Sequence, residues 1–358
     1  MPEENESMDS SVHLTHQWLR KSLGNYIRSK QAVREIPPEI LAIRCSRWVE
    51  AHGLEGLFYR ATSDDAVLKK SLCRWRNKAM AELCANLQAL QATIKLFAFL
   101  DAAEIPAAAM RGVVLAHSEY GSPAERTMRD VDVLAPSQSK EIIVRLLTAK
   151  GYPPVEKLRS QDVFKIDGTV VEMHWSLLTA KRYCARVDTK QLLQSRRRVE
   201  TQDGNLYALS PEFELIGLVL HAFVHHELTI VKQLVDIGLY MKKTDLNWDF
   251  IANWCQEARL VKMFALTFCL VDKLFFLKDD QWWQALSPAS GNSLSAHSLK
   301  KRAQAWIDPF FGKRTVASCL MEKRNLLYAA EEPSIKFRQY LKFASFSTLR
   351  DLYRHASR

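Results

Sequence analysis

An Asp-Gly pair at residues 167–168 constrains the fold of this chain more than any other feature of the sequence. It separates two segments, 162–166 and 169–177, that look like the two strands of a hairpin. Asp-Gly favours a two-residue hairpin turn, because both turn positions need a positive φ. The pattern predicts an antiparallel pair of strands, and on the second strand Glu172 and His174 share one face because side chains alternate between faces.

A second predicted strand spans residues 128–134, where apolar and charged side chains alternate. Asp130 and Asp132 stand two positions apart on it and therefore project from the same face. Upstream, the short apolar segment 105–110 reads as a strand that ends in a tight turn at Arg111-Gly112, followed by a helix over 113–120. The sequence thus places strands and helices together in the middle of the chain.

Helical patterns flank this middle region on both sides. Residues 13–104 and 209–358 read as mainly helical, and Pro211 after Ser210 is a helix-start signal. One apolar stripe recurs at spacings of three or four: Leu87, Leu90, Ile94, Phe97 and Leu100. The fold class expected is α+β, with a small mixed sheet at 105–208, helical regions at 13–104 and 209–358, and a disordered tail at 1–12.

The paired aspartates point to divalent-metal chemistry. Asp130 and Asp132 lie close enough on one strand face to share cations, and oxygen ligands suit Mg²⁺ or Mn²⁺. A third carboxylate normally completes such a site, and Glu172 lies on a strand that could pair alongside. Two metals on these three acids could stabilise the entering and leaving oxygens of a phosphoryl or nucleotidyl transfer.

The Arg111-Gly112 turn is the expected binding site for the phosphates of a nucleoside triphosphate. A glycine lets backbone N–H groups approach phosphate oxygens, and the helix that follows adds a partial positive charge. Arg111, Arg126 and Arg129 are the nearby cations that could neutralise the β and γ phosphates.

These motifs resemble those of the uncharacterised bacterial nucleotidyltransferase family within the DNA polymerase β-like superfamily. The likeness runs over roughly residues 75–240 and rests on five pieces of sequence: Ile105-Pro106, Met110-Arg111-Gly112, Arg126-Thr127-Met128-Arg129-Asp130-Val131-Asp132-Val133-Leu134, Gly151-Tyr152 and Val171-Glu172-Met173-His174-Trp175.

The resemblance implies a polymerase β-like fold that transfers a nucleotide from a nucleoside triphosphate, ATP among them, to an acceptor. It also implies that Asp130, Asp132 and Glu172 are metal ligands and that Gly112 lies at the phosphate turn. The chain departs from the family pattern twice. Arg111 stands where the family usually has lysine, and Val113 stands where the wider superfamily has serine, which removes a hydroxyl contact to phosphate.

Two alternatives to the enzyme stay open. The chain could be a non-catalytic nucleotide-binding or scaffold protein. Its net charge of +10 also fits a toxin-like protein that modifies tRNA. Among the histidines, His174 is read as a hydrogen-bonding neighbour of the site, while His221, His225 and His226 have a spacing that suits zinc but is read as helix packing.

Composition favours a cytoplasmic protein. The N-terminus is acidic, without the basic start and apolar stretch of a secretory signal, and the apolar runs at 215–224 and 264–276 are too short to span a bilayer. Seven scattered cysteines fit neither a disulfide framework nor a structural zinc site. The sequence does not distinguish among a small molecule, a peptide or protein, and RNA as the acceptor of the nucleotide.

Overall fold

A computed structural model describes residues 17–29, 46–62, 69–177, 188–201, 203–243, 245–291, 294–311, 325–326 and 328–329. The expected disordered tail at 1–12 lies outside these residues. Contacts divide the chain into two compact units. Unit 1 comprises Met1–Thr15 and Ser29–Leu218, and unit 2 comprises His16–Arg28 and Val219–Arg358.

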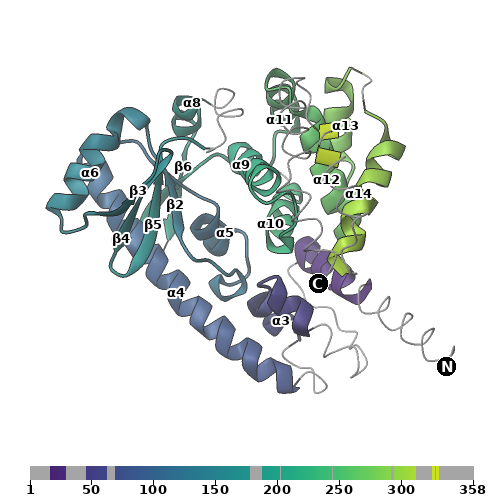
Figure 1. The fold of residues 1–358 in the computed structure, drawn as a ribbon, viewed down its shortest axis with the longest axis horizontal. Helices are drawn as coiled ribbons and strands as arrows, with labels where there is room; N and C mark the ends of the chain where they lie inside the picture. Colours follow the sequence, from purple (N-terminus) through teal and green to yellow (C-terminus); the bar gives the residue numbers. More distant parts are fainter. Residues whose placement is uncertain are drawn as a thin grey trace, which may run out of the picture. The chain divides into compact units, whose positions relative to one another are not determined.

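Unit 1 holds all the described strands of the protein (Figure 1). Its elements are α3 (Glu55–Thr62), α4 (Lys69–Ala102), β1 (Ala108–Met110), α5 (Gly112–Ser118), η1 (Pro123–Glu125), β2 (Val131–Leu134), η2 (Ser137–Ser139), α6 (Lys140–Ala149), β3 (Pro154–Lys157), β4 (Gln161–Ile166), β5 (Thr169–His174), α8 (Thr189–Gln194), β6 (Arg197–Thr201), β7 (Gly204–Ala208) and most of α9 (Pro211–Val224).

The seven strands form one mixed sheet in the order β3-β4-β5-β2-β1-β7-β6. β2 runs parallel to β5 and antiparallel to β1, while β1 runs parallel to β7. The prediction of a mixed sheet with flanking helices is therefore confirmed. This order brings β2, which follows the first predicted aspartate, beside the strand that carries Glu172.

The predicted hairpin is confirmed. β4 and β5 pair antiparallel from Ile166 opposite Thr169 to Gln161 opposite His174. Asp167 has φ 48° and Gly168 has φ 89°, the two positive values that a tight primed turn requires. The turn is further held by Lys95 of α4, whose ammonium lies 2.8 Å from the Asp167 carboxylate.

The core of unit 1 lies between the sheet and the helices α4 and α6, which cover one face of it (Figure 1). Full burial of one large apolar side chain, such as Leu or Phe, stabilises a fold by roughly 1.5–3 kcal/mol. The predicted stripe on α4 is confirmed at Leu90, Phe97 and Leu100, whereas Leu87 is exposed. Alternate strand residues supply a further part of the core: Val131, Val133, Val171, Met173, Phe164, Ile166, Leu206 and Ala208.

One stretch among the described residues, Cys73–Ala102 of α4, is long and apolar enough to cross a membrane by length and composition, with a mean hydropathy of 1.3 over an 18-residue window. It is longer than the apolar runs at 215–224 and 264–276. Leu90, Leu96 and Phe97 of this helix are buried in the core of unit 1, and a core helix meets the same criteria. A membrane span therefore has no support from this helix.

Several strand limits differ from those expected. β1 begins at Ala108 and β2 at Val131, each three residues later than predicted, because Pro106 cannot donate to a ladder and residues 128–130 precede the pairing. Beyond the predicted strands, the sheet includes β3, β6 and β7. Residues 137–149 form the short η2 and α6, and the chain turns soon afterwards at Gly151, which has φ 90°.

Unit 2 consists of helices joined by loops, with no strand among its described residues. Besides the helical residues 17–28 and the end of α9 it contains α10 (Val231–Met241), α11 (Trp248–Glu257), α12 (Val261–Phe275), α13 (Gln281–Ala289) and α14 (Ala296–Phe311). Contacts link α12 to α10, α13 and α14, so α12 is the central helix of the group. Phe264 and Phe268 of α12 are fully buried there.

Candidate active site

The face of the sheet opposite α4 and α6 carries the candidate site. Because side chains alternate along a strand, Val131 and Val133 enter the core while Asp132 points the other way. The parallel register sets Asp132 beside Glu172, and His174 lies two residues further along β5 on the same face. The predicted convergence of an aspartate from β2 and Glu172 from β5 is thus realised by strand pairing.

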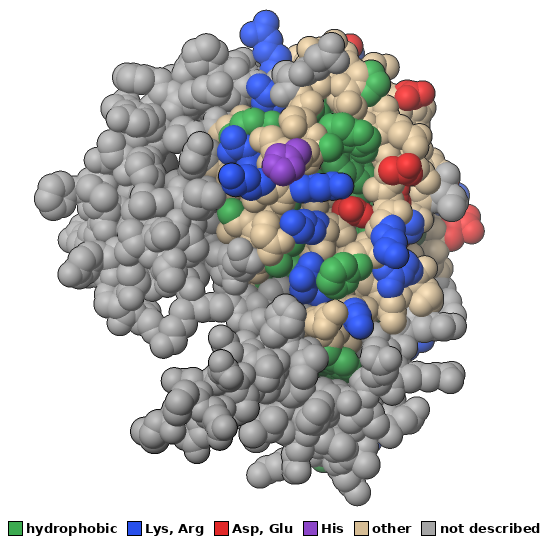
Figure 2. Space-filling model, turned by 90° about the vertical axis from the view of Figure 1, so that its right-hand side faces the viewer, with side chains coloured by type: hydrophobic (Ala, Val, Ile, Leu, Met, Phe, Trp, Pro, Cys, Tyr) green, Lys and Arg blue, Asp and Glu red, His purple; other side chains and the backbone are tan. Residues whose placement is uncertain are grey.

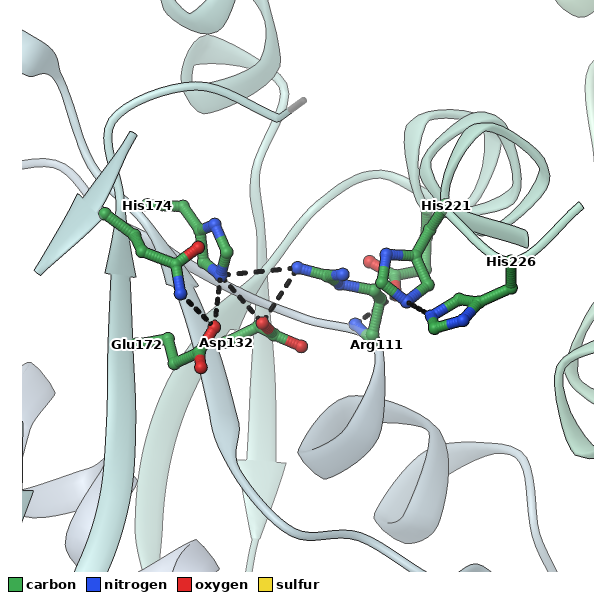
Figure 3. A network of polar contacts seen from close by, with 8 residues as sticks. Arg111, Asp132, Glu172, His174, His221 and His226 are labelled. Carbon is green, nitrogen blue, oxygen red and sulfur yellow. Dashed lines mark hydrogen bonds and ion pairs between the residues drawn. The ribbon is translucent and has the colours of Figure 1, made fainter. Parts of the chain in front are cut away.

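Asp132, Glu172 and His174 form a compact polar cluster (Figure 3). The Nε2 atom of His174 lies 2.8 Å from Oδ1 of Asp132 and 3.4 Å from Oε2 of Glu172. Gln161 of β4 donates from its side-chain amide to Glu172 over 2.6 Å. Burial acts to lower the pKa of His174, but the hydrogen bonds to Asp132 and Glu172 outweigh it and leave that pKa raised. The cluster therefore favours a cationic imidazole between two carboxylates.

Arg111 joins this cluster from the turn after β1 (Figure 3). Its Nη2 atom donates to Oδ1 of Asp132 over 2.8 Å and lies 3.4 Å from the imidazole of His174. The side chains of Arg111 and Asp132 are only 11% and 12% exposed. This nearly buried ion pair places a cation at the same carboxylate that the sequence analysis assigned to metal.

The backbone of Arg111 has an unusual conformation. It precedes α5 with φ 55° and ψ −117°, a combination that residues with a side chain rarely adopt. Glu214 of α9, which is 1% exposed, accepts the Arg111 backbone N–H through Oε1. A strained backbone conformation persists only where surrounding interactions stabilise it. Here the buried hydrogen bond from the Arg111 N–H to Glu214 is one of those interactions.

Burial raises the pKa of the Glu214 carboxyl to about 7. The hydrogen bond from the Arg111 amide and the positive charges of Arg111 and Arg197 lower that pKa, while Asp132 raises it. Glu214 is thus a buried acid whose charge changes near neutral pH.

Gly112 and Arg126 lie together at the start of α5. A Cβ on Gly112 would stand 2.7 Å from Sδ of Met128 and 3.3 Å from Nη1 of Arg126, so a larger residue would displace the Met128 side chain. Arg126 is 7% exposed, and its carbonyl accepts from the buried amide of Asn86 over 2.8 Å. The Arg126 guanidinium therefore lies against Gly112, which follows the Arg111 that contacts Asp132.

Two predicted residues are placed differently. Asp130 is half-buried in the segment just before β2, and its carboxylate is not in the group formed by Asp132, Glu172 and His174. Arg129 is exposed, in contrast to Arg126. Both positions adjoin the site along the chain, and their roles toward metal and phosphate stay predictions.

Asp132, Glu172 and His174 offer a donor set that fits a divalent cation. One ligand atom from each lies within 4.8 Å of the others. Carboxylate oxygens suit Mg²⁺ and Mn²⁺, and His174 could join them as a ligand only after its imidazole releases the proton that the two carboxylates favour. Across the described ranges this is the single group of three such side chains with metal-like spacing.

The histidines at 221, 225 and 226 belong to unit 2. Nε2 of His221 lies 3.2 Å from Nε2 of His226, and the rings of His221 and His225 are 5.3 Å apart. Within the described residues they do not form part of a metal-like group of three. The packing interpretation therefore accounts for them better than zinc.

Glu214 was not identified as a site residue in the sequence. The available signal is an acid in the first turn of α9 whose neighbours Phe213, Leu215 and Ile216 are all apolar. An ionisable group on an otherwise apolar helix needs a polar partner when it is buried. That rule flags the residue, but only the fold reveals Arg111 as the partner.

The sequence of this chain matches a family of nucleotidyltransferases. Residues 42–276 match the sequence profile of the uncharacterised nucleotidyltransferase family. No curated protein matches the chain.

Two solved structures illustrate the similarity. ANT(2″)-Ia, in complex with adenylyl-2″-tobramycin, is 15% identical with a TM-score of 0.35, and the match covers 46% of this chain and 93% of that one. An antigenic nucleotidyltransferase-like protein from Paracoccidioides brasiliensis is 16% identical with a TM-score of 0.34, covering 60% and 92%. Because the family profile extends over more than half of the sequence, including all of the strands and the whole polar cluster, this chain belongs to the uncharacterised nucleotidyltransferase family.

Proposed function

We propose that the protein transfers a nucleotide from a nucleoside triphosphate to an acceptor in a reaction that depends on divalent metal. The observation that carries the proposal is the pairing of Asp132 with Glu172 on adjacent parallel strands, with Arg111 in contact with Asp132. Carboxylates beside an arginine are suited to metal-bound phosphates, because phosphoryl chemistry depends on positioning and neutralisation of charge.

Asp132 and Glu172, with Asp130 just before β2, would hold the cations, and Arg111, Gly112, Arg126 and Arg129 would bind the phosphates. Bound cations supply charge neutralisation on the triphosphate and stabilise the oxygens that enter and leave the α-phosphorus. The acceptor oxygen forms its bond to that phosphorus as pyrophosphate departs. Glu172 has a 24% exposed side chain and is the better placed of the two strand carboxylates to take the acceptor's proton.

The direct test is incubation with each labelled nucleoside triphosphate, Mg²⁺ or Mn²⁺, and three acceptor pools: small metabolites, proteins and tRNA. Label transfer with pyrophosphate release, abolished by a chelator, is the expected result. Nucleotide binding without pyrophosphate release from any pool would instead identify a nucleotide sensor. Labelling confined to tRNA would support the RNA-modifying alternative within the same chemistry.

The Arg111–Asp132 ion pair should compete with metal. Replacing Arg111 with glutamine removes the cation from the Asp132 carboxylate, so the affinity for Mn²⁺ without nucleotide should rise about tenfold, equivalent to ~1.4 kcal/mol. Nucleotide affinity should fall, because a phosphate partner is lost. Calorimetric titration measures both. Arg145→Gln, which removes the same charge from an exposed position on α6, should change neither, and an unaltered Mn²⁺ affinity in Arg111→Gln would contradict the competition.

A further inference from the structure

Unit 2 contains a cavity of about 730 Å³, within the range of small-molecule sites. Its walls come from α12, α13, α14 and the helical residues 17–29. Figure 2 shows the face that carries α13 and α14, where lysine and arginine side chains gather around apolar ones. None of the residues assigned above to nucleotidyl transfer lines this cavity.

The apolar part of the lining is aromatic. Phe276, Trp282, Trp283 and Leu299 all contribute to it, and the two indole rings pack edge to face with centroids 5.8 Å apart. Trp282 is 6% exposed, and its indole N–H has no acceptor within the described parts of the chain. That nitrogen is itself shielded from solvent, so Trp282 contributes apolar ring surface to the lining and not its N–H.

Four cationic side chains also line the cavity: Arg20, Lys273, Lys278 and Lys300. Arg20 stacks on the ring of Phe276 at 4.2 Å and donates to the carbonyls of Lys273 and Leu274. Lys273 donates to the carbonyl of Lys300 over 3.3 Å. These acceptors are neutral, so they leave the positive charges in place.

The three acids of the lining are already engaged by the fold. Asp279 receives Lys242 at 3.1 Å and the backbone N–H of Gln281. Asp272 accepts the Asp279 backbone N–H, and Asp280 accepts the side-chain amide of Gln284. For Lys278 and Lys300, by contrast, no ion pair with a carboxylate occurs among the described residues. Four cations thus face three acids in the lining, and Lys242, which lies outside the lining, pairs with one of those acids, so the cavity has a net positive charge next to aromatic walls.

We propose that this cavity binds an organic anion with a flat apolar body, such as an aromatic carboxylate or sulfonate. The body lies against Trp282, Trp283 and Phe276, where aromatic surfaces stack and water is excluded. The acidic group faces Lys278 and Lys300. The site is separate from the proposed transferase chemistry and does not depend on it.

The probe is 8-anilinonaphthalene-1-sulfonate, an aromatic sulfonate whose fluorescence rises in apolar surroundings. The full-length protein should bind one molecule per chain in a saturable manner. The double variant Lys278→Gln/Lys300→Gln should weaken binding about tenfold, equivalent to ~1.4 kcal/mol, because two ionic contacts to the sulfonate are lost. Lys301→Gln, an exposed neighbour outside the lining, should retain wild-type affinity.

A second variant separates the cavity from general surface charge. Ala296 lines the cavity at an exposed position, so Ala296→Trp should fill the space and abolish probe binding while the chain stays folded. Cooperative urea unfolding of each variant verifies the fold. Wild-type affinity in Ala296→Trp, equal weakening by Lys301→Gln, or equally tight binding of the neutral N-phenyl-1-naphthylamine would overturn the assignment.

Discussion

Replacing Asp132 with asparagine is expected to lower the rate of nucleotidyl transfer by about 10³-fold, because a metal ligand contributes several kcal/mol of charge stabilisation in the transition state. Asp132 is the residue on which the cluster converges: its Oδ1 atom contacts both Arg111 and His174 at 2.8 Å. The amide keeps the shape of the side chain and removes the charge. Pyrophosphate release at saturating nucleotide measures the effect.

The matched control is Asp167→Asn, which makes the same chemical change at the exposed hairpin turn, outside the polar cluster. Its transfer rate should stay within threefold of wild type. Thermal unfolding of both variants shows whether the sheet is intact, since loss of the partner of a buried Arg111 also costs stability. A folded Asp132→Asn protein with near wild-type turnover would remove this carboxylate from the chemistry.

The elements that local sequence patterns describe well are those stabilised by near neighbours. The hairpin of β4 and β5 needs only the two-residue turn at 167–168 and alternating segments beside it. The apolar stripe of α4 needs only a helical period. The pairing of β2 with β5 was suggested by the positions of three carboxylates, and the register of Asp132 with Glu172 agrees with it.

Strands β6 and β7 were not predicted from the sequence, because their partners are distant along the chain and their composition is polar. β6 has the sequence Arg-Arg-Val-Glu-Thr, in which three of the five side chains are charged. β7 joins the sheet through Ala208 beside Ala109, 208 − 109 = 99 residues earlier. No local pattern contains that contact, and edge strands commonly carry charge because one side stays unpaired.

The candidate site was predictable where strand alternation determines it and unpredictable where the helix α9 completes it. Alternation placed Glu172 and His174 on one face before any fold was known. Glu214 comes to Arg111 from 214 − 111 = 103 residues away, and its importance rests on burial and on the positive φ of Arg111. Neither the burial of Glu214 nor the φ of Arg111 can be predicted from the amino acids around residue 214.

The free energy of unfolding should fall as pH rises from about 5 to 8, and Glu214→Gln should remove much of this dependence. In the folded protein the pKa of Glu214 is raised from 4.5 to about 7, so the folded chain retains a proton that the unfolded chain has released. The stabilisation by Glu214 is therefore fully present below pH 4.5, the pKa of this carboxyl in the unfolded chain. It is lost as the pH rises toward about 7, the pKa of the same carboxyl in the folded chain. The loss amounts to about 3 kcal/mol at most.

Glutamine keeps an oxygen for the Arg111 amide and stays neutral, so Glu214→Gln should match wild type at pH 5 and exceed it at pH 8. Urea unfolding at each pH measures this, and Glu212→Gln, in the same helical turn at a half-buried position, should retain the wild-type profile. Identical pH profiles for wild type and Glu214→Gln would show that Glu214 does not control the dependence. Glu214→Leu then isolates the hydrogen bond: it also lacks charge but leaves the buried Arg111 N–H without its acceptor, so it should be roughly 1–3 kcal/mol less stable than Glu214→Gln at every pH.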